Sequence, residues 1–125
     1  MESKQVLEVY KNFAVIGVSK DHDKYGYKIF KRLIEKGYHT FGISPIYDQV
    51  DGYQLYKSLE DINHPIDVVV FVVNKKYAKD YIDQMRALGI GYAWMQPNTY
   101  DDEILAYLEL NGIHSIIDCI LIKTK

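Results

Sequence analysis

The sequence has very little cysteine, since Cys119 is the only one among 125 residues. A single thiol excludes an intramolecular disulfide and zinc sites built from several cysteines. The 4 histidines lie on separate segments without the spacing of metal ligands, and Ser19 has no evident base beside it. The pattern therefore predicts neither a metal centre nor catalytic residues. Cys119 itself is expected to be a small buried residue, with a thiol near a ligand crevice as the alternative.

Long apolar runs and an excess of one charge are also absent. Nowhere do about 18 apolar residues follow one another, and the first residues lack the apolar stretch of a signal peptide, which favours a cytoplasmic protein. The 15 Lys and Arg residues and the 17 Asp and Glu residues give a formal net charge of −2. No overall field therefore draws the chain to nucleic acid or to an anionic membrane, and we expect a small-molecule partner. A homodimer is left open.

Proline is scarce, and Pro45, Pro65 and Pro97 all fall between periodic segments. No linker, repeat or low-complexity tract divides the chain. The hydrophobic fraction of 48% is ordinary for a packed protein. We therefore predict a single domain over residues 1–125.

Strand patterns alternate with helix patterns along the chain. Strands are predicted at Phe13–Val18, Tyr38–Ser44, Asp67–Val73, Gly91–Gln96 and Ile113–Asp118, with a short edge strand at Tyr53–Tyr56. Helices are predicted at Gly26–Lys36, at Asp101–Leu110 after an N-cap at Asn98 or Thr99, and through a helical stripe of Ala78, Tyr81, Ile82, Met85 and Leu88 that Gly89 ends. This alternation predicts an α/β fold: an open parallel sheet of five or six strands in the order 3-2-1-4-5-6, with helices on both faces.

Ligands of such sheets bind at the carboxyl ends of the strands. The first strand ends in Gly17, Val18, Ser19 and Lys20, and the other ends are Ser44–Tyr47, Val73–Lys76 and Gln96–Asn98. The predicted order places the crevice between the first strand and the strand at Asp67–Val73.

The first loop carries half of a dinucleotide-binding pattern. Gly17 allows close approach of a phosphate, Ser19 offers a hydroxyl, and the helix beginning near Tyr25 offers unpaired N–H groups. A plain turn from strand to helix is the alternative. No acidic residue follows the second strand until Asp48, which counts against an ordinary NAD-dependent dehydrogenase.

Lysines gather at two predicted helix starts, where cations oppose the helix dipole. Asn74 resembles an N-cap and is followed by Lys75 and Lys76, while Lys24 and Lys28 stand at the start of the first helix. Either these side chains are merely solvated, or a polyanion such as a pyrophosphate lies between the two helix starts.

In order along the chain, four segments resemble the small single-domain CoA-binding proteins, a Rossmann-like family related to the CoA-binding domain of succinyl-CoA synthetase α subunits and ADP-forming acyl-CoA synthetases. They are FAVIGVS (13–19), YGYKIFKRLIEKGYHTFGISP (25–45), SLEDINHPIDVVVFVV (58–73) and RALGIGYAWMQ (86–96). The resemblance covers residues 10–123 and implies a three-layer α/β/α fold that binds CoA or an acyl-CoA across the strand ends.

The resemblance also implies a set of binding residues. Gly17, Ser19 and Lys20 match the family's phosphate loop, Ser44 and Pro45 match its Asn-Pro pair near the adenosine, Val73, Asn74 and Lys75 match the next loop, and Gln96 matches the following one. Tyr25, beside the first loop, is expected to stack on adenine or to line the pantetheine groove.

Three departures from the family stand out. The first loop has Asp21–Lys24 where the family often has a proline, Pro45 is followed by Ile46 rather than a basic residue, and the family's Asp-x-Cys is shortened to Asp118-Cys119. The synthetases' phosphorylated histidine lies in a following domain, so we expect a binding module rather than an enzyme. The alternatives are an NAD(H)- or nucleotide-sensing protein and a small CoA-dependent acyl transferase that uses Cys119 or a histidine.

Overall fold

The β-branched runs form the centre of a sheet in a computed structural model, which describes residues 1–125. The strands are β1 (Asn12–Ile16), β2 (His39–Ile43), β3 (Gln49–Val50), β4 (Tyr53–Tyr56), β5 (Val68–Phe71), β6 (Tyr92–Met95) and β7 (His114–Ile117). They lie in the order β3-β4-β2-β1-β5-β6-β7. All neighbours are parallel except the antiparallel pair of β3 and β4. The predicted order is confirmed, with β4 as the third strand, but the predicted count misses β3, whose two residues are too short for a periodic pattern.

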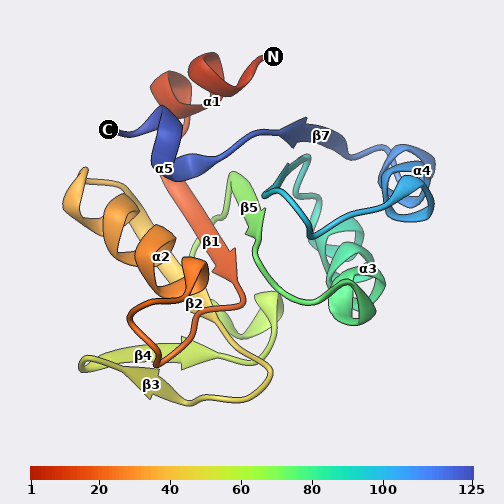
Figure 1. The fold of residues 1–125 in the computed structure, drawn as a ribbon. Helices are drawn as coiled ribbons and strands as arrows, with labels where there is room; N and C mark the ends of the chain where they lie inside the picture. The colour runs from red at the N-terminus through yellow and green to blue at the C-terminus, as the bar shows by residue number, and fades with distance from the viewer.

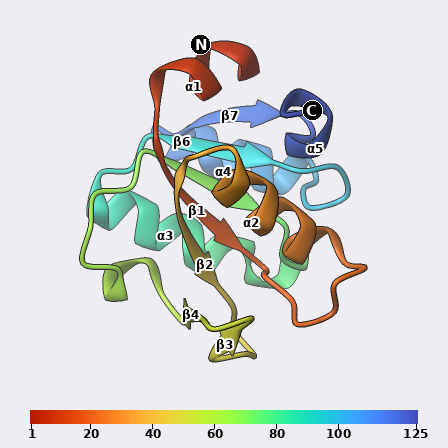
Figure 2. The same cartoon turned by 90° about the vertical axis from the view of Figure 1, so that its left-hand side faces the viewer.

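Helices cover both faces of the sheet (Figures 1 and 2). The predicted helices are α2 (Tyr25–Glu35), α3 (Ala78–Leu88) and α4 (Asp102–Leu110), while α1 (Ser3–Val9) and α5 (Ile120–Lys123) were not predicted. Two 3₁₀ turns, η1 (Leu59–Asp61) and η2 (Lys75–Tyr77), come before β5 and α3, and η2 follows Asn74, where a helix start was predicted. Helices α1 and α5 lie beside each other although they come from opposite ends of the chain. A hydrogen bond of 2.8 Å from Ser3 Oγ to Asp118 Oδ2 connects these two regions.

The core has two halves because successive side chains of a strand point to opposite faces. On β1, Phe13 and Val15 pack toward α1, α2 and α5, while Ala14 and Ile16 pack toward α3 and α4. All of these side chains are fully buried. This arrangement confirms the three-layer α/β/α fold.

One local prediction is wrong. The N-cap of α4 is Asp101, whose side chain accepts the Ile104 N–H at 2.8 Å, because Asn98 and Thr99 belong to a turn that ends β6. The predicted stripe of α3 is helical and ends at Gly89, but its last residue, Leu88, is exposed. None of the helices combines the length and the apolar character needed to cross a lipid bilayer.

Candidate functional site

A cleft of about 590 Å³ opens where the carboxyl ends of β1, β5 and β6 meet. The chain leaves β1 toward one face of the sheet and β5 toward the other, so the cleft lies at the point where the strand order reverses. The lining residues are Gly17, Ser19, Lys24, Tyr25, Gly26, Val72, Val73, Asn74, Gln96, Pro97, Asn98, Thr99, Cys119 and Ile122. The predicted crevice between β1 and β5 is therefore present.

Two glycines bring backbone segments close together at this edge. Gly17 has a φ of +105°, and a Cβ there would lie 2.7 Å from the backbone nitrogen of Val73. A Cβ on Gly26 would overlap the carbonyl oxygen of Gly17, so α2 begins directly against the end of β1. The N-cap of α2 is Lys24, which makes no side-chain capping hydrogen bond. The first turn of α2 thus presents uncapped N–H groups and the positive end of the helix dipole beside the cleft.

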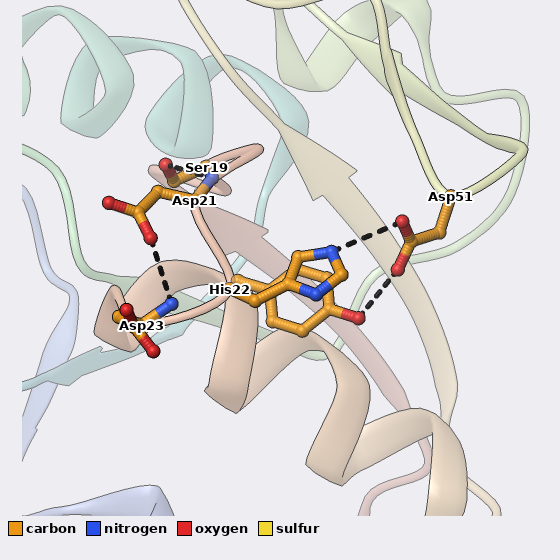
Figure 3. Close-up of polar contacts among 6 residues, drawn as sticks. Ser19, Asp21, His22, Asp23 and Asp51 are labelled. Carbon is orange, nitrogen blue, oxygen red and sulfur yellow. Dashed lines mark hydrogen bonds and ion pairs between the residues drawn. The ribbon is translucent and has the colours of Figure 1, made fainter.

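The loop between β1 and α2 is held by its own side chains (Figure 3). Ser19 Oγ accepts the N–H of Asp21 at 3.0 Å, and Asp21 Oδ1 accepts the N–H of Asp23 at 2.9 Å. The Ser19 hydroxyl oxygen is therefore used within the loop, while its proton is available to a ligand anion.

On the β5 side, Asn74 caps a 3₁₀ turn. Its side chain accepts the N–H of Lys76 at 3.1 Å, and η2 separates this cap from the start of α3 at Ala78. Lys75 and Lys76 are exposed. Together with Lys24, they take part in none of the structure's ion pairs, which involve Lys57, Lys79, Lys123 and His22. Their charges are therefore not neutralised by a carboxylate of the chain.

The far wall of the cleft is built by Gln96 and the segment before α5. Gln96 is only 4% exposed, and its Oε1 accepts the N–H of Ile120 at 2.7 Å while its Nε2 lies 3.5 Å from Cys119 Sγ. The Gln96 amide thus anchors α5. Cys119 is half-buried and lines the cleft, so its interpretation as a core residue is wrong and the alternative position near the crevice holds.

The structure brings some of the predicted site residues together and leaves others outside the cleft. Gly17, Ser19, Tyr25, Val73, Asn74 and Gln96 line it, whereas Val18, Lys20, Ser44, Pro45 and Lys75 do not. Val18 is buried in the core, and Ser44 Oγ accepts the N–H groups of Ile46 and Tyr47, which shapes the loop after β2. Lys20 Nζ lies 5.5 Å from the centre of the Tyr47 ring. This loop therefore has a cation beside it although no basic residue follows Pro45.

Sequence reasoning placed Lys24 at a helix start and Pro97 and Asn98 at a strand end near the ligand, and all three line the cleft. It missed Gly26, Val72, Thr99 and Ile122 as ligand contacts. Gly26 carried a signal, because it ends the loop that begins at Gly17. Ile122 carried none, since it lines the cleft only through the position of α5 in the tertiary structure.

A cluster of His22, Tyr27 and Asp51 stands outside the cleft, where the β1–α2 loop and the start of α2 meet the β3–β4 turn. Figure 3 draws the cluster, with Tyr27 as the unlabelled side chain. Asp51 Oδ2 accepts the Tyr27 hydroxyl at 2.5 Å, and Asp51 Oδ1 lies 3.2 Å from His22 Nε2. The hydrogen bond to Asp51 raises the pKa of Tyr27 to about 12, and the same bond lowers the pKa of Asp51. No three His, Cys, Asp or Glu side chains of the chain are placed to hold a metal ion.

The Tyr27 pKa gives a testable pH window. A folded pKa above the unfolded value of 10.0 means that the contact stabilises fully below pH 10 and is lost as the pH rises through about 12. The lowered Asp51 pKa means that the contact is present above the unfolded value of 3.8 and is lost as the pH falls through the folded one. The pKa values of Tyr10, Tyr38, Tyr81 and Tyr107 are raised as well, so the ultraviolet pH titration of the wild type is compared with that of Tyr27→Phe. We expect the difference to isolate a tyrosine that titrates at about pH 12 and that returns to about pH 10 in Asp51→Gly. Titration of Tyr27 near 10 in the wild type would contradict the contact.

A comparison with sequence models of protein families finds a match to the family described as CoA binding domain, and this match covers residues 11–125. The chain belongs to the CoA-binding domain family. The predicted resemblance is thereby confirmed.

Relatives of this CoA-binding domain include parts of larger proteins and small proteins. The α subunit of acetate–CoA ligase (ADP-forming) II from Pyrococcus furiosus is 33% identical over 81 residues, which cover 64% of this chain but only 18% of that subunit. The uncharacterized protein YneT of Bacillus subtilis is 25% identical over 94% of this chain and 87% of its own length. A hypothetical protein from Pyrococcus horikoshii OT3 has a TM-score of 0.89 and 29% identity, covering 96% of this chain and 85% of that one.

Proposed function

We propose that this CoA-binding domain binds CoA or an acyl-CoA in the cleft between β1 and β5 and performs no chemistry of its own. The observation that carries the proposal is the cleft at the strand-order reversal, with the uncapped start of α2 on one side and Asn74 on the other. Backbone N–H groups at a helix start and nearby cations are the groups that bind a pyrophosphate. Membership in the family and a relative named as an acetate–CoA ligase subunit support CoA as the nucleotide.

The composition of the lining supports a binding role. The only ionisable side chains among the lining residues are Lys24, Tyr25 and Cys119, and no His, Asp or Glu is among them. General acid–base catalysis needs a side chain that gains or loses a proton near neutral pH within hydrogen-bond reach of the substrate. The lining offers one cation, Lys24, and the hydroxyl groups of Ser19 and Tyr25 to hold an anion, but no carboxylate or imidazole base.

The proposal predicts a large and selective thermal shift. CoA or acetyl-CoA at about 100 times its dissociation constant should stabilise the protein by about 2.7 kcal/mol, or roughly 10 °C in Tm. NAD, NADH and ATP should give much smaller shifts, because they lack the pantetheine arm that the cleft between Asn98 and Ile122 would bury. Differential scanning fluorimetry with all five ligands measures this. A larger shift with NADH than with CoA would instead favour the nucleotide-sensing alternative.

A pair of double variants separates phosphate binding from general charge. Lys75→Ala with Lys76→Ala removes two unpaired cations at the β5 side of the cleft and should weaken CoA binding by about tenfold at low salt. Lys11→Ala with Lys36→Ala makes the same change in net charge at the amino-terminal ends of the strands, since Lys11 precedes β1 and Lys36 follows α2. This control variant should leave the affinity for CoA unchanged. Equal affinities in the two variants would count against anion binding at η2.

The position of Cys119 favours one second candidate, an acyl transfer in which the thiol attacks the thioester of an acyl-CoA. The acyl–sulfur bond to CoA would break, an acyl–Cys119 bond would form, and CoA would leave as its thiol. Mass spectrometry after incubation with acetyl-CoA tests this. A modified protein that is absent in Cys119→Ala would support transfer, and an unmodified wild type would support the binding module.

A further inference from the structure

The tip of the β3–β4 hairpin reaches the loop that borders the cleft. Strands β3 and β4 are joined by Asp51 and Gly52, both with positive φ, +49° and +82°. Such a two-residue turn is the tightest connection between antiparallel strands and favours Asp-Gly. It presents the Asp51 carboxylate at the end of the hairpin (Figure 3).

At the tip of the hairpin, the Asp51 carboxylate contacts two different elements. His22, which lies within 3.2 Å of Asp51 Oδ1, belongs to the β1–α2 loop, and Tyr27, which donates to Oδ2, belongs to the first turns of α2. The His22 and Tyr27 rings stack with centroids 3.9 Å apart and planes 14° apart. Asp51 therefore ties the loop and the helix start to each other and to the hairpin.

The tied elements are those that line the cleft. The loop supplies Ser19 and Lys24 to the lining, and the helix start supplies Tyr25 and Gly26. The middle of the loop is exposed and otherwise held by bonds within itself, such as the 3.1 Å bond from Lys24 N–H to the Asp21 carbonyl. Asp51 does not line the cleft, so it acts on a ligand only through these neighbours.

We propose that Asp51 is a positioning residue for ligand binding, which holds the β1–α2 loop and the start of α2 in the arrangement that receives the phosphates. The proposal rests on the proposed function, because it takes CoA as the ligand. A loop that is ordered before binding loses less conformational entropy when the ligand arrives. The β3–β4 hairpin thus affects ligand binding although none of its residues lines the cleft.

The positive φ of Asp51 determines which substitutions are suitable at this position. Asp51→Gly removes the carboxylate but keeps the positive φ without strain, whereas Asp51→Asn keeps both the turn and an oxygen that accepts the Tyr27 hydroxyl. Asp48→Ala is the matched control, because it removes an exposed carboxylate nearby that pairs with Lys57 instead.

Two measurements are made on each variant: the amide hydrogen exchange of residues 20–25 without ligand, and the association and dissociation rates of CoA by stopped flow. In Asp51→Gly, we expect faster exchange and an affinity for CoA that falls about three- to tenfold, mainly through slower association. Asp51→Asn should stay within about twofold of the wild type, as should Asp48→Ala.

Wild-type association and affinity in Asp51→Gly would overturn the positioning role, whether or not the loop exchanges faster. An equal loss in Asp48→Ala would overturn it too, because the effect would then be one of net charge. If the wild-type protein does not bind CoA, the proposed function is wrong and the positioning role falls with it. The two failures are therefore distinguishable.

Discussion

Replacing Gly26 by alanine is expected to lower the free energy of unfolding by about 3 kcal/mol, at the upper end of the usual cost of overpacking. The added Cβ would overlap the Gly17 carbonyl oxygen and lie 3.3 Å from the Val18 Cα. Both atoms are backbone at the end of a buried strand, so no flexible side chain can move aside. The gain in helix propensity from Gly to Ala, about 1 kcal/mol, offsets only part of this cost. Urea denaturation followed by circular dichroism measures the difference.

Gly91→Ala provides the matched control. No atom lies within 4 Å of a Cβ at Gly91, and its φ is not positive. We expect its stability to change by less than about 0.5 kcal/mol. Similar stabilities for Gly26→Ala and Gly91→Ala would mean that α2 does not begin against β1. Because relief of the overlap separates α2 from Gly17, the alanine at position 26 should also abolish CoA binding.

Replacing Trp94 by alanine is expected to cost about 3–5 kcal/mol, the range for truncating a large buried aromatic side chain. Trp94 is fully buried on β6, in the half of the core that also holds α1, α2 and α5. Its Nε1–H donates to the Asp118 carbonyl at 3.0 Å, next to Cys119. The variant therefore loses both a large apolar contact and the support of the far cleft wall. Because Trp94 is the only tryptophan, unfolding must be followed by circular dichroism rather than by tryptophan fluorescence.

Two further variants test how much of this loss of stability comes from the hydrogen bond, and whether the loss is specific to a buried position. Trp94→Phe keeps much of the apolar volume but leaves the Asp118 carbonyl without its donor, and it should cost less than Trp94→Ala. Leu110→Ala removes a large side chain that is 81% exposed and should change the stability by less than about 0.5 kcal/mol. Equal losses at positions 94 and 110 would contradict the central place of Trp94 in the core.

The sheet was predictable because its signals are local. Val68–Phe71 is a continuous apolar run, and a strand buried on both faces needs apolar side chains at every position. The parallel order followed from alternating strands and helices, since crossover connections are almost always right-handed. The short elements α1, α5 and β3 were missed, because a few residues cannot show a period and their stability comes from contacts with distant segments.

For the candidate site, the sequence predicted which strand ends form the cleft. The ends of β1, β5 and β6 contribute Gly17, Val73 and Gln96 to the cleft, as their places in the sequence predict. Ser44 was a reasonable candidate from the same rule, but its hydroxyl oxygen accepts two backbone N–H groups of the following loop. Whether a polar side chain faces a ligand or its own backbone depends on the local turn.

The amino-acid sequence by itself determined the α/β class, the strand order and the edge of the sheet where ligands bind, because hydrophobic periodicity and the handedness of crossovers act over short stretches of chain. Only the tertiary structure decided that Cys119 and Ile122 line the same cleft as Gly17, and that Asp51 ties His22 to Tyr27. These arrangements bring together residues far apart in the chain, and their geometry depends on the packing of whole elements, which no local pattern encodes.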